Sequence, residues 1–96
     1  MIIAKVMGTA VASIKHDALQ TAKILLVCQT DASGNVSSEP FLAIDLVGSG
    51  EGELVIVSQG SSARLATGHK ESPVDAAIIG ILNSLHYKEE TIFRKE

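Results

Sequence analysis

Apolar residues fall into five short runs along the chain, separated by polar or glycine-rich segments. The runs occupy residues 2–12, 23–30, 41–47, 53–58 and 74–82. They are rich in Val, Ile, Leu and Ala, and the last of them is short for a buried helix and interrupted by Gly80. Such runs are typical of strands that bury their side chains in a common core. The pattern therefore predicts five short strands.

Turn-forming residues divide these runs. Gly8 lies inside the first run, where a glycine predicts a bulge or a sharp bend. Residues 13–21 are polar and indicate a loop. The sequence Asp-Ala-Ser-Gly-Asn at 31–35 is a dense turn signal that favours a hairpin. Pro40 cannot donate a ladder hydrogen bond, so we expect it to precede the third strand.

Glycine occupies every second position after the third run, at Gly48, Gly50 and Gly52. Because glycine reaches positive φ and allows close approach of two backbones, this spacing predicts a tightly specified turn between two buried strands. The segment differs from a phosphate-binding P-loop, which needs Gly-Lys-Ser/Thr followed by a helix. Glu51 and Glu53 would also repel phosphate.

The fourth run ends at the sequence Gly-Ser-Ser-Ala-Arg, residues 60–64. Residues 61–67 favour a helix of one or two turns, with Ser61 or Ser62 as its N-cap and Gly68 at its end. The order differs from the Gly-x-Ser-x-Gly turn that carries a nucleophilic serine in hydrolases, so no such nucleophile is expected.

Five strands, one short helix and bend-forming glycines together predict an all-β fold, a small closed five-stranded barrel. Closure also removes the exposed sheet edges of so apolar a chain. Residues 69–73 are expected to form a polar loop and residues 84–96 a charged C-terminal tail. Within the tail, residues 91–93 suit a short strand added to this chain or to a neighbour. The 96 residues are expected to form one domain, 1–96.

Composition points to an oligomer. The chain is 46% apolar but 3% aromatic, and a chain of this size buries only roughly 60–65% of its unfolded surface. Surplus apolar surface of this kind is commonly covered by another subunit. The formal net charge of −3 disfavours nucleic-acid binding. No apolar run approaches the roughly 18 residues of a membrane span, so no membrane contact is expected.

The opening run is predicted to be a strand and not a signal peptide, because no positive charge precedes it and Lys5 interrupts it. Cys28 is the one cysteine and lies in an apolar run. It is expected to be a small buried hydrophobe, which suits a reducing compartment.

No catalytic or metal-binding constellation stands out. His16, His69 and His86 lack the spacing of metal ligands, and no cysteine pair accompanies them. The adjacent Lys15, His16 and Asp17 would rarely converge on one substrate atom. We therefore expect neither an enzyme nor a bound metal or cofactor.

Arg64 is the most informative polar residue. Its guanidinium is a forked donor suited to a carboxylate such as Asp45 or Asp75, either in the same subunit or across an interface. The alternative is an exposed arginine on a helix.

Several segments together resemble one known family. They are Ala-Lys-Val-Met-Gly at 4–8, Lys-Ile-Leu-Leu-Val at 23–27, the glycine-rich block at 43–53, Gly-Ser-Ser-Ala-Arg at 60–64, and Pro-Val-Asp-Ala-Ala-Ile-Ile-Gly-Ile at 73–81. On these residues the sequence resembles the bacterial microcompartment vertex proteins of the EutN/CcmL family. The family usually has alanine where this chain has Ser49.

The resemblance implies an OB-like five-stranded barrel that assembles into a homopentamer. Such pentamers cap the vertices of polyhedral protein shells that enclose metabolic enzymes in the bacterial cytoplasm. The implied partners are other copies of the chain, with a hexamer possible in crystals, and the hexameric proteins of the same shell. Physical reasoning agrees, because six-fold tiles alone make a flat sheet and a closing ring needs a head-to-tail interface.

The resemblance also suggests where subunits meet. It places residues 61–64 and residues 48–52 near the contacts, so the candidate set is Asp45, Gly48, Gly50, Gly52, Ser61, Ser62, Arg64 and Asp75. The alternative function is an OB-type module for single-stranded nucleic acid or oligosaccharide. Such modules stack bases on aromatic side chains in a positive groove. This chain offers only Phe41, Tyr87 and Phe93 and is acidic overall.

Overall fold

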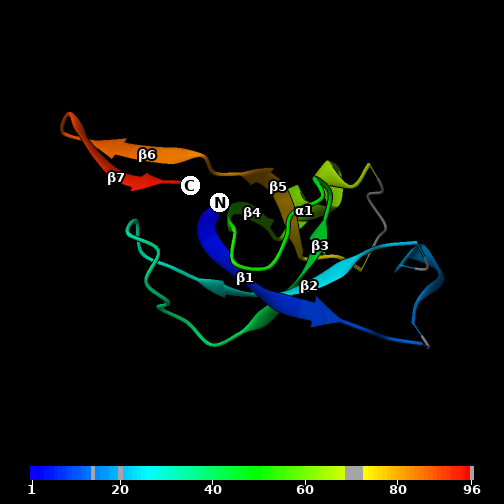
Figure 1. The fold of residues 1–96 in the computed structure, drawn as a ribbon. Helices are drawn as coiled ribbons and strands as arrows, with labels where there is room; N and C mark the ends of the chain where they lie inside the picture. Colours follow the sequence, from blue (N-terminus) through cyan, green and yellow to red (C-terminus); the bar gives the residue numbers. More distant parts are fainter. Residues whose placement is uncertain (14, 20, 69–72, 96) are drawn as a thin grey trace.

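The computed structural model describes residues 1–13, 15–19, 21–68 and 73–95 of the chain. A closed barrel and a separate hairpin make up its strands (Figure 1). The barrel strands are β1 (Ile2–Ala10), β2 (Ile24–Gln29), β3 (Phe41–Asp45), β4 (Leu54–Gln59) and β5 (Ala76–Ile81). The hairpin consists of β6 (Ser84–Tyr87) and β7 (Glu90–Arg94), and the helices are the 3-10 turn η1 (Asp17–Leu19) and α1 (Ser61–Ala66). The predicted five-stranded barrel with one short α-helix is confirmed.

The strand order around the barrel is β1-β2-β3-β5-β4, and pairing of β4 with β1 closes it. The β3–β5 pair is parallel, with Ile44 opposite Ala77, whereas the other neighbouring barrel strands run antiparallel. Because β5 lies between β3 and β4, the glycine-rich segment does not form a hairpin turn between paired strands. It crosses one end of the barrel instead.

Small and β-branched side chains fill the barrel. Alternate residues of the strands point inward, and Ala4, Val6, Leu25, Val27, Val55, Val57 and Ile78 are each at most 2% exposed. Fully burying a Val, Leu or Ile contributes about 1.5–3 kcal/mol. Cys28 is buried as well, as predicted.

A second apolar cluster covers part of the outside of the barrel. It combines Ile44, Ala63, Val74 and Ala77 with partly buried neighbours that include Leu19 and Ile24. Since Ala63 belongs to α1 and Leu19 to η1, both short helices are held by this outer cluster. The sequence predicted a loop at 13–21, and η1 is its one 3-10 turn among the described residues.

Element boundaries differ from the predictions in instructive places. β3 ends at Asp45, two residues early, because residues 46–52 turn into the barrel end. The bulge expected at Gly8 is confirmed by a register shift between Val6 and Gly8. Gly68 follows α1 with a φ of 79° and donates its N–H to the Leu65 carbonyl at 3.1 Å, as predicted for a helix end.

The predicted serine N-cap is wrong. Gly60, with a φ of 65°, occupies the N-cap position of α1, and no side chain caps the helix. Ser61 and Ser62 lie one and two residues after Gly60, inside the first turn, where their hydroxyls are not placed to cap the helix. Most of the polar loop expected at 69–73, residues 69–72, lies outside the described residues.

The C-terminal tail is ordered as the β6–β7 hairpin, which projects from the barrel (Figure 1). The strand expected at 91–93 therefore pairs within this chain, with Leu85 opposite Phe93. Lys88 and Glu89 form the turn with φ values of 50° and 65°. Two successive positive φ values are the signature of a type I′ hairpin turn.

Candidate subunit-contact residues

The eight candidate residues fall into two groups. Gly48, Gly50 and Gly52 belong to the segment of residues 46–52 that crosses the barrel end, and Asp45 is the last residue of β3, just before it. Ser61, Ser62 and Arg64 lie on α1. Asp75 joins this helix group, because its carbonyl accepts the Gly60 N–H at 2.8 Å.

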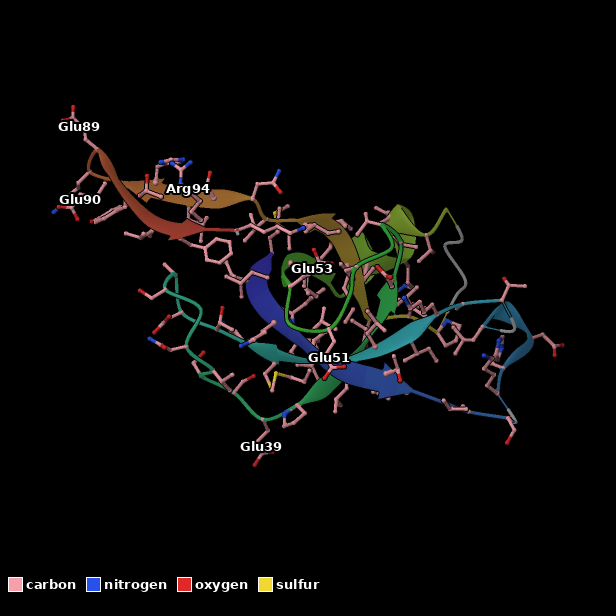
Figure 2. All side chains as sticks on the ribbon, viewed as in Figure 1. Glu39, Glu51, Glu53, Glu89, Glu90 and Arg94 are labelled. Atoms are coloured by element: carbon pink, nitrogen blue, oxygen red, sulfur yellow. The ribbon has the colours of Figure 1, made fainter. Side chains whose placement is uncertain are left out.

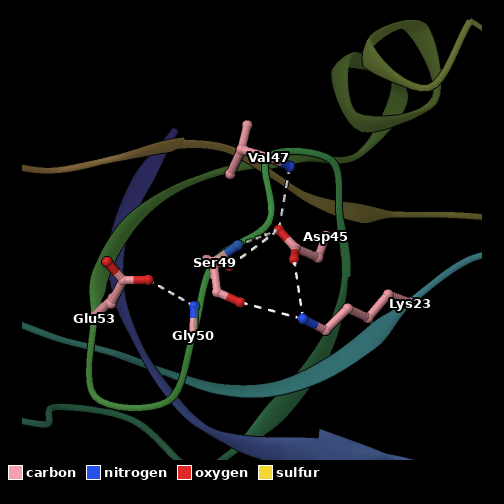
Figure 3. Close-up of polar contacts among 6 residues, drawn as sticks. All are labelled: Lys23, Asp45, Val47, Ser49, Gly50 and Glu53. Atoms are coloured by element: carbon pink, nitrogen blue, oxygen red, sulfur yellow. Dashed lines mark hydrogen bonds and ion pairs between the residues drawn. The ribbon is translucent and has the colours of Figure 1, made fainter.

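The carboxylate of Asp45 organises the first group (Figure 3). Its Oδ1 accepts hydrogen bonds from the Val47 N–H at 3.2 Å, the Ser49 N–H at 3.2 Å and the Ser49 hydroxyl at 3.0 Å. Lys23 Nζ lies 3.8 Å from Oδ2 and donates to the Ser49 carbonyl at 3.4 Å. One buried carboxylate thus fixes the loop, and Ser49 is 1% exposed.

The cation beside Asp45 is Lys23. The Asp45 side chain is 1% exposed and its Oδ2 accepts no hydrogen bond from the described residues, so the ion pair is its compensation for burial. The pairing of Asp45 with Arg64 that the sequence suggested is not formed within the described residues. The carboxylate is directed into its own protomer.

The three glycines differ in their roles. Gly48 and Gly52 have φ values of 77° and 87°, which favour glycine, whereas Gly50 lies outside the positive-φ region. Gly50 donates its N–H to Glu53 Oε1 at 2.7 Å. The Gly52 N–H donates to the Val6 carbonyl at 2.8 Å, and this hydrogen bond links the loop to β1.

Glu53 connects this loop to the root of the hairpin. Its Oε2 pairs with the ammonium of Lys95, and the Lys95 N–H donates to the Asn83 carbonyl at 2.6 Å. The hydrogen bond from Lys95, together with that from the Gly50 N–H, lowers the pKa of the Glu53 carboxyl below its ordinary value. Loop and hairpin are therefore joined through one exposed ion pair.

The helix group faces outward. Ala63 is fully buried against the barrel, whereas Ser61 and Ser62 are exposed and Arg64 is half-buried. Ion pairs between described residues are Lys23–Asp45 and Lys95–Glu53, so Arg64 is not paired with Asp75 in the protomer. Leu65, beside Arg64, is 63% exposed. The helix group is therefore exposed to solvent, whereas Asp45 of the loop group is buried.

Four residues outside the predicted set fix the loop of residues 46–52 and join it to the hairpin root. They are Lys23, Ser49, Glu53 and Lys95. Their partners lie up to 42 positions away along the chain. One local signal existed, because Ser49 replaces the alanine usual in the family and supplies a hydroxyl to Asp45.

The described residues offer little chemistry. They contain no group of three His, Cys, Asp or Glu side chains that could hold a metal, and His69 lies outside them. No helix among them is long and apolar enough to cross a membrane.

The aromatic side chains that an oligonucleotide-binding groove requires lie far apart in this fold. Phe41 packs against the barrel core, while Tyr87 and Phe93 lie on the hairpin. Acidic side chains are spread from Glu39 and Glu51 to the hairpin tip (Figure 2). The aromatic residues therefore form no joint stacking platform on the barrel.

Comparison with known proteins gives a consistent result. The family model described as ethanolamine utilisation protein EutN/carboxysome matches residues 1–83. The carboxysome shell vertex protein CcmL of Nostoc sp. is 39% identical over 97 residues, covering 100% of this chain and 96% of the relative. The microcompartment shell vertex protein EutN of Salmonella typhimurium is 39% identical, covering 99% and 96%.

Solved structures agree over the same length. An ethanolamine utilization protein EutN superimposes with a TM-score of 0.93 at 38% identity, covering 100% of both chains. The GrpN pentameric microcompartment shell protein of Rhodospirillum rubrum gives a TM-score of 0.82 at 37% identity, covering 91% of this chain and 99% of its own. Sequence and barrel thus agree that this chain belongs to the EutN/CcmL family, whose relatives named above are shell vertex proteins of bacterial microcompartments and carboxysomes.

Proposed function

We propose that this protein is a structural shell protein whose pentamers cap the vertices of a polyhedral bacterial microcompartment. The observation that carries the proposal is the match to GrpN, a pentameric shell protein, at 37% identity and a TM-score of 0.82. The role requires no catalysis, and the relatives named above are vertex proteins rather than enzymes.

Symmetry explains why such a protein is needed. A shell of six-fold tiles stays flat unless five-fold points are introduced, and a five-membered ring needs two different surfaces on each copy. The protomer has apolar side chains available for such surfaces, among them Leu42, Leu65 and Tyr87, each more than half exposed. These features support assembly with other copies of the chain.

Arg64 and Asp75 are the candidate residues that we expect to form ion pairs with a neighbouring copy. Neither is paired with the other in the protomer, and Asp75 is exposed. The loop of residues 48–52 contributes indirectly, because Asp45 and Ser49 fix its shape from inside. Ser61 and Ser62 lie beside Arg64 on the exposed side of α1.

The remaining partners follow from the vertex role. A pentamer at a vertex is surrounded by hexameric tiles of the shell, and the shell lies in the bacterial cytoplasm. The acidic composition and the scattered aromatic residues give no support to the alternative of a single-strand binding module.

Co-assembly tests the vertex role directly. A hexameric shell protein from the same genome is expressed alone and together with this chain, and the products are imaged by electron microscopy. Open sheets or tubes without the chain and closed polyhedra with it support the proposal. Closed shells that form equally well without the chain would contradict it.

A further inference from the structure

The polar face of the β6–β7 hairpin holds a histidine between two hydroxyl groups. Ser84 and His86 are two positions apart in β6, so their side chains lie on the same face of the strand. Thr91 of β7 is directly opposite His86 in the register of the hairpin. Because directly opposite residues of an antiparallel pair share a face, the three side chains lie together on one side of the hairpin.

The imidazole of His86 contacts a hydroxyl with each of its two nitrogens. Nε2 lies 3.0 Å from the Ser84 hydroxyl oxygen, and Nδ1 lies 3.2 Å from the Thr91 hydroxyl oxygen. A neutral imidazole has one N–H donor and one acceptor nitrogen, whereas a hydroxyl can donate or accept. With the proton on Nδ1, the imidazole donates to Thr91, and its Nε2 accepts the hydrogen bond of the Ser84 O–H.

This order of groups is that of an activated nucleophile. A serine hydroxyl within about 2.6–3.2 Å of a base, with the base oriented by a third group, is the arrangement that activates serine for covalent chemistry. Here Ser84 supplies the nucleophile, His86 the base and Thr91 the orienting hydroxyl. Thr91 reaches His86 only because the turn at Lys88 and Glu89 folds β7 back onto β6.

The Ser84 hydroxyl differs from the other hydrogen-bonded serine hydroxyls in the described part of the chain. Those of Ser37 and Ser38 donate to backbone carbonyls, which do not accept a proton at neutral pH, and Ser49 is buried. Ser84 instead contacts a nitrogen base.

The reactive face is also accessible. His86 and Thr91 are exposed and Ser84 is half-buried, on a hairpin that projects from the barrel (Figure 1). An incoming reagent can therefore reach the Ser84 hydroxyl from solvent.

We propose that Ser84 is a site of covalent acylation by activated acyl donors, such as thioesters and acyl phosphates. The Ser84 Oγ attacks the acyl carbon, an Oγ–C bond forms, and the bond from that carbon to the leaving group breaks. The Ser84 proton passes to His86 Nε2 and from there to the leaving group or to water. The product is an acylated chain, so the step is a single modification of a structural protein and not a catalytic cycle.

The first test treats the full chain with p-nitrophenyl acetate at neutral pH. Absorbance follows the released p-nitrophenolate, and mass spectrometry of the digested chain locates each acetyl group. Acetylation of Ser84 is expected to be about a hundredfold faster than that of the exposed Ser37, the low end of what a positioned base contributes. Acetyl groups confined to lysines, or equal labelling of Ser84 and Ser37, would overturn the proposal.

The second test assigns the roles with single variants. Ser84→Ala is expected to abolish the rapid release of p-nitrophenolate. His86→Gln should slow acetylation of Ser84 to the rate of Ser37, because an amide does not take up the proton. Thermal unfolding of each variant verifies the fold. A Ser84 acetylation rate that is unchanged in His86→Gln would overturn the proposal.

Thr91 is a positioning residue in this arrangement, and its test is rescue by a conservative variant. Thr91→Val keeps the shape of the side chain and removes the hydroxyl, so acetylation of Ser84 is expected to fall about fivefold, as for the loss of one hydrogen bond. Thr91→Ser restores a hydroxyl and should restore the rate. Equal rates in Thr91→Val and Thr91→Ser would overturn the orienting role.

The outcome does not depend on the vertex function. Mass in solution reports whether the unmodified chain forms a ring, and acetylation reports only the reactivity of Ser84. A ring in which Ser84 is not acetylated overturns this inference and leaves the vertex function standing. Rapid acetylation of Ser84 in a chain that forms no ring supports this inference and contradicts the vertex function.

Discussion

At the scale of single residues, Asp45 is the side chain on which the loop at the barrel end depends. Asp45→Ala removes three hydrogen bonds from a buried position and leaves Lys23 without its partner. We expect it to reduce the free energy of unfolding by about 2–3 kcal/mol. Chemical denaturation measures this, with the exposed Glu39→Ala as a control. Equal stability of the two variants would rule out the structural role of Asp45.

We propose that Arg64 contributes to assembly and not to folding. Arg64→Glu is expected to weaken the oligomer more than the protomer, because its guanidinium is unpaired with Asp45 or Asp75 within the described protomer. Mass in solution and thermal unfolding distinguish the two effects, and Arg94→Glu makes the same charge change elsewhere. An Arg64→Glu variant that stays fully oligomeric at micromolar concentration would contradict the assignment.

Glu53 makes stability depend on pH. Its hydrogen bonds from Lys95 and the Gly50 N–H hold its pKa in the folded state below the ordinary value of 4.5. The contribution is therefore present above the unfolded pKa and is lost as pH falls through the folded pKa. Asp31 acts in the same direction, because the Asn35 N–H lowers its pKa.

The corresponding variant is Glu53→Gln. It should flatten the loss of stability between neutral pH and acid conditions relative to the unmodified chain. Denaturant titrations at a series of pH values measure this difference, with Glu39→Gln as the control. A parallel acid profile in Glu53→Gln and the unmodified chain would remove Glu53 from the explanation.

At the scale of elements, the strands were predictable because each is a local apolar run bounded by turn residues. The pairing of β3 with β5 was not, since it joins residues 33 positions apart, such as Ile44 and Ala77. The N-cap was misassigned because Gly60 makes the turn through its backbone alone. The hairpin was only partly anticipated, because its turn uses Lys88 and Glu89 at positive φ, where glycine or asparagine is the usual signal.

The candidate residues show the same difference between local sequence signals and long-range contacts. Arg64, Ser61 and Ser62 stay predicted contact residues, which were selected because they lie in one short motif. The ion pairs of Lys23 and Lys95 were missed because they depend on contacts between distant segments.

The barrel is expected to fold independently of the hairpin. Truncation after Ser84 removes β7 and most of β6 but none of the barrel strands. It should therefore leave the barrel folded and reduce the stability of the oligomer. Circular dichroism checks the barrel, and mass measured over a dilution series checks the oligomer. Unchanged thermal unfolding together with unchanged mass would count against this role.

At the scale of the whole molecule, a small barrel with exposed apolar side chains such as Leu42 and Leu65, together with an extended hairpin, is suited to a ring. The shape is elongated, 45 Å along its longest axis against 23 and 21 Å across. Its length comes largely from the hairpin that projects beyond the barrel (Figure 1). A projecting hairpin is only marginally stable when nothing packs against it, so we expect assembly to stabilise this one.

Formation of a pentamer is tested by the mass of the protein in solution, from native mass spectrometry or light scattering. The chain has a mass of 10.1 kDa, so five copies give 50.5 kDa and six give 60.6 kDa. We expect the five-copy mass at micromolar concentration. A stable 10.1 kDa monomer would contradict it, and a six-copy mass would keep the family fold but contradict the five-fold vertex role.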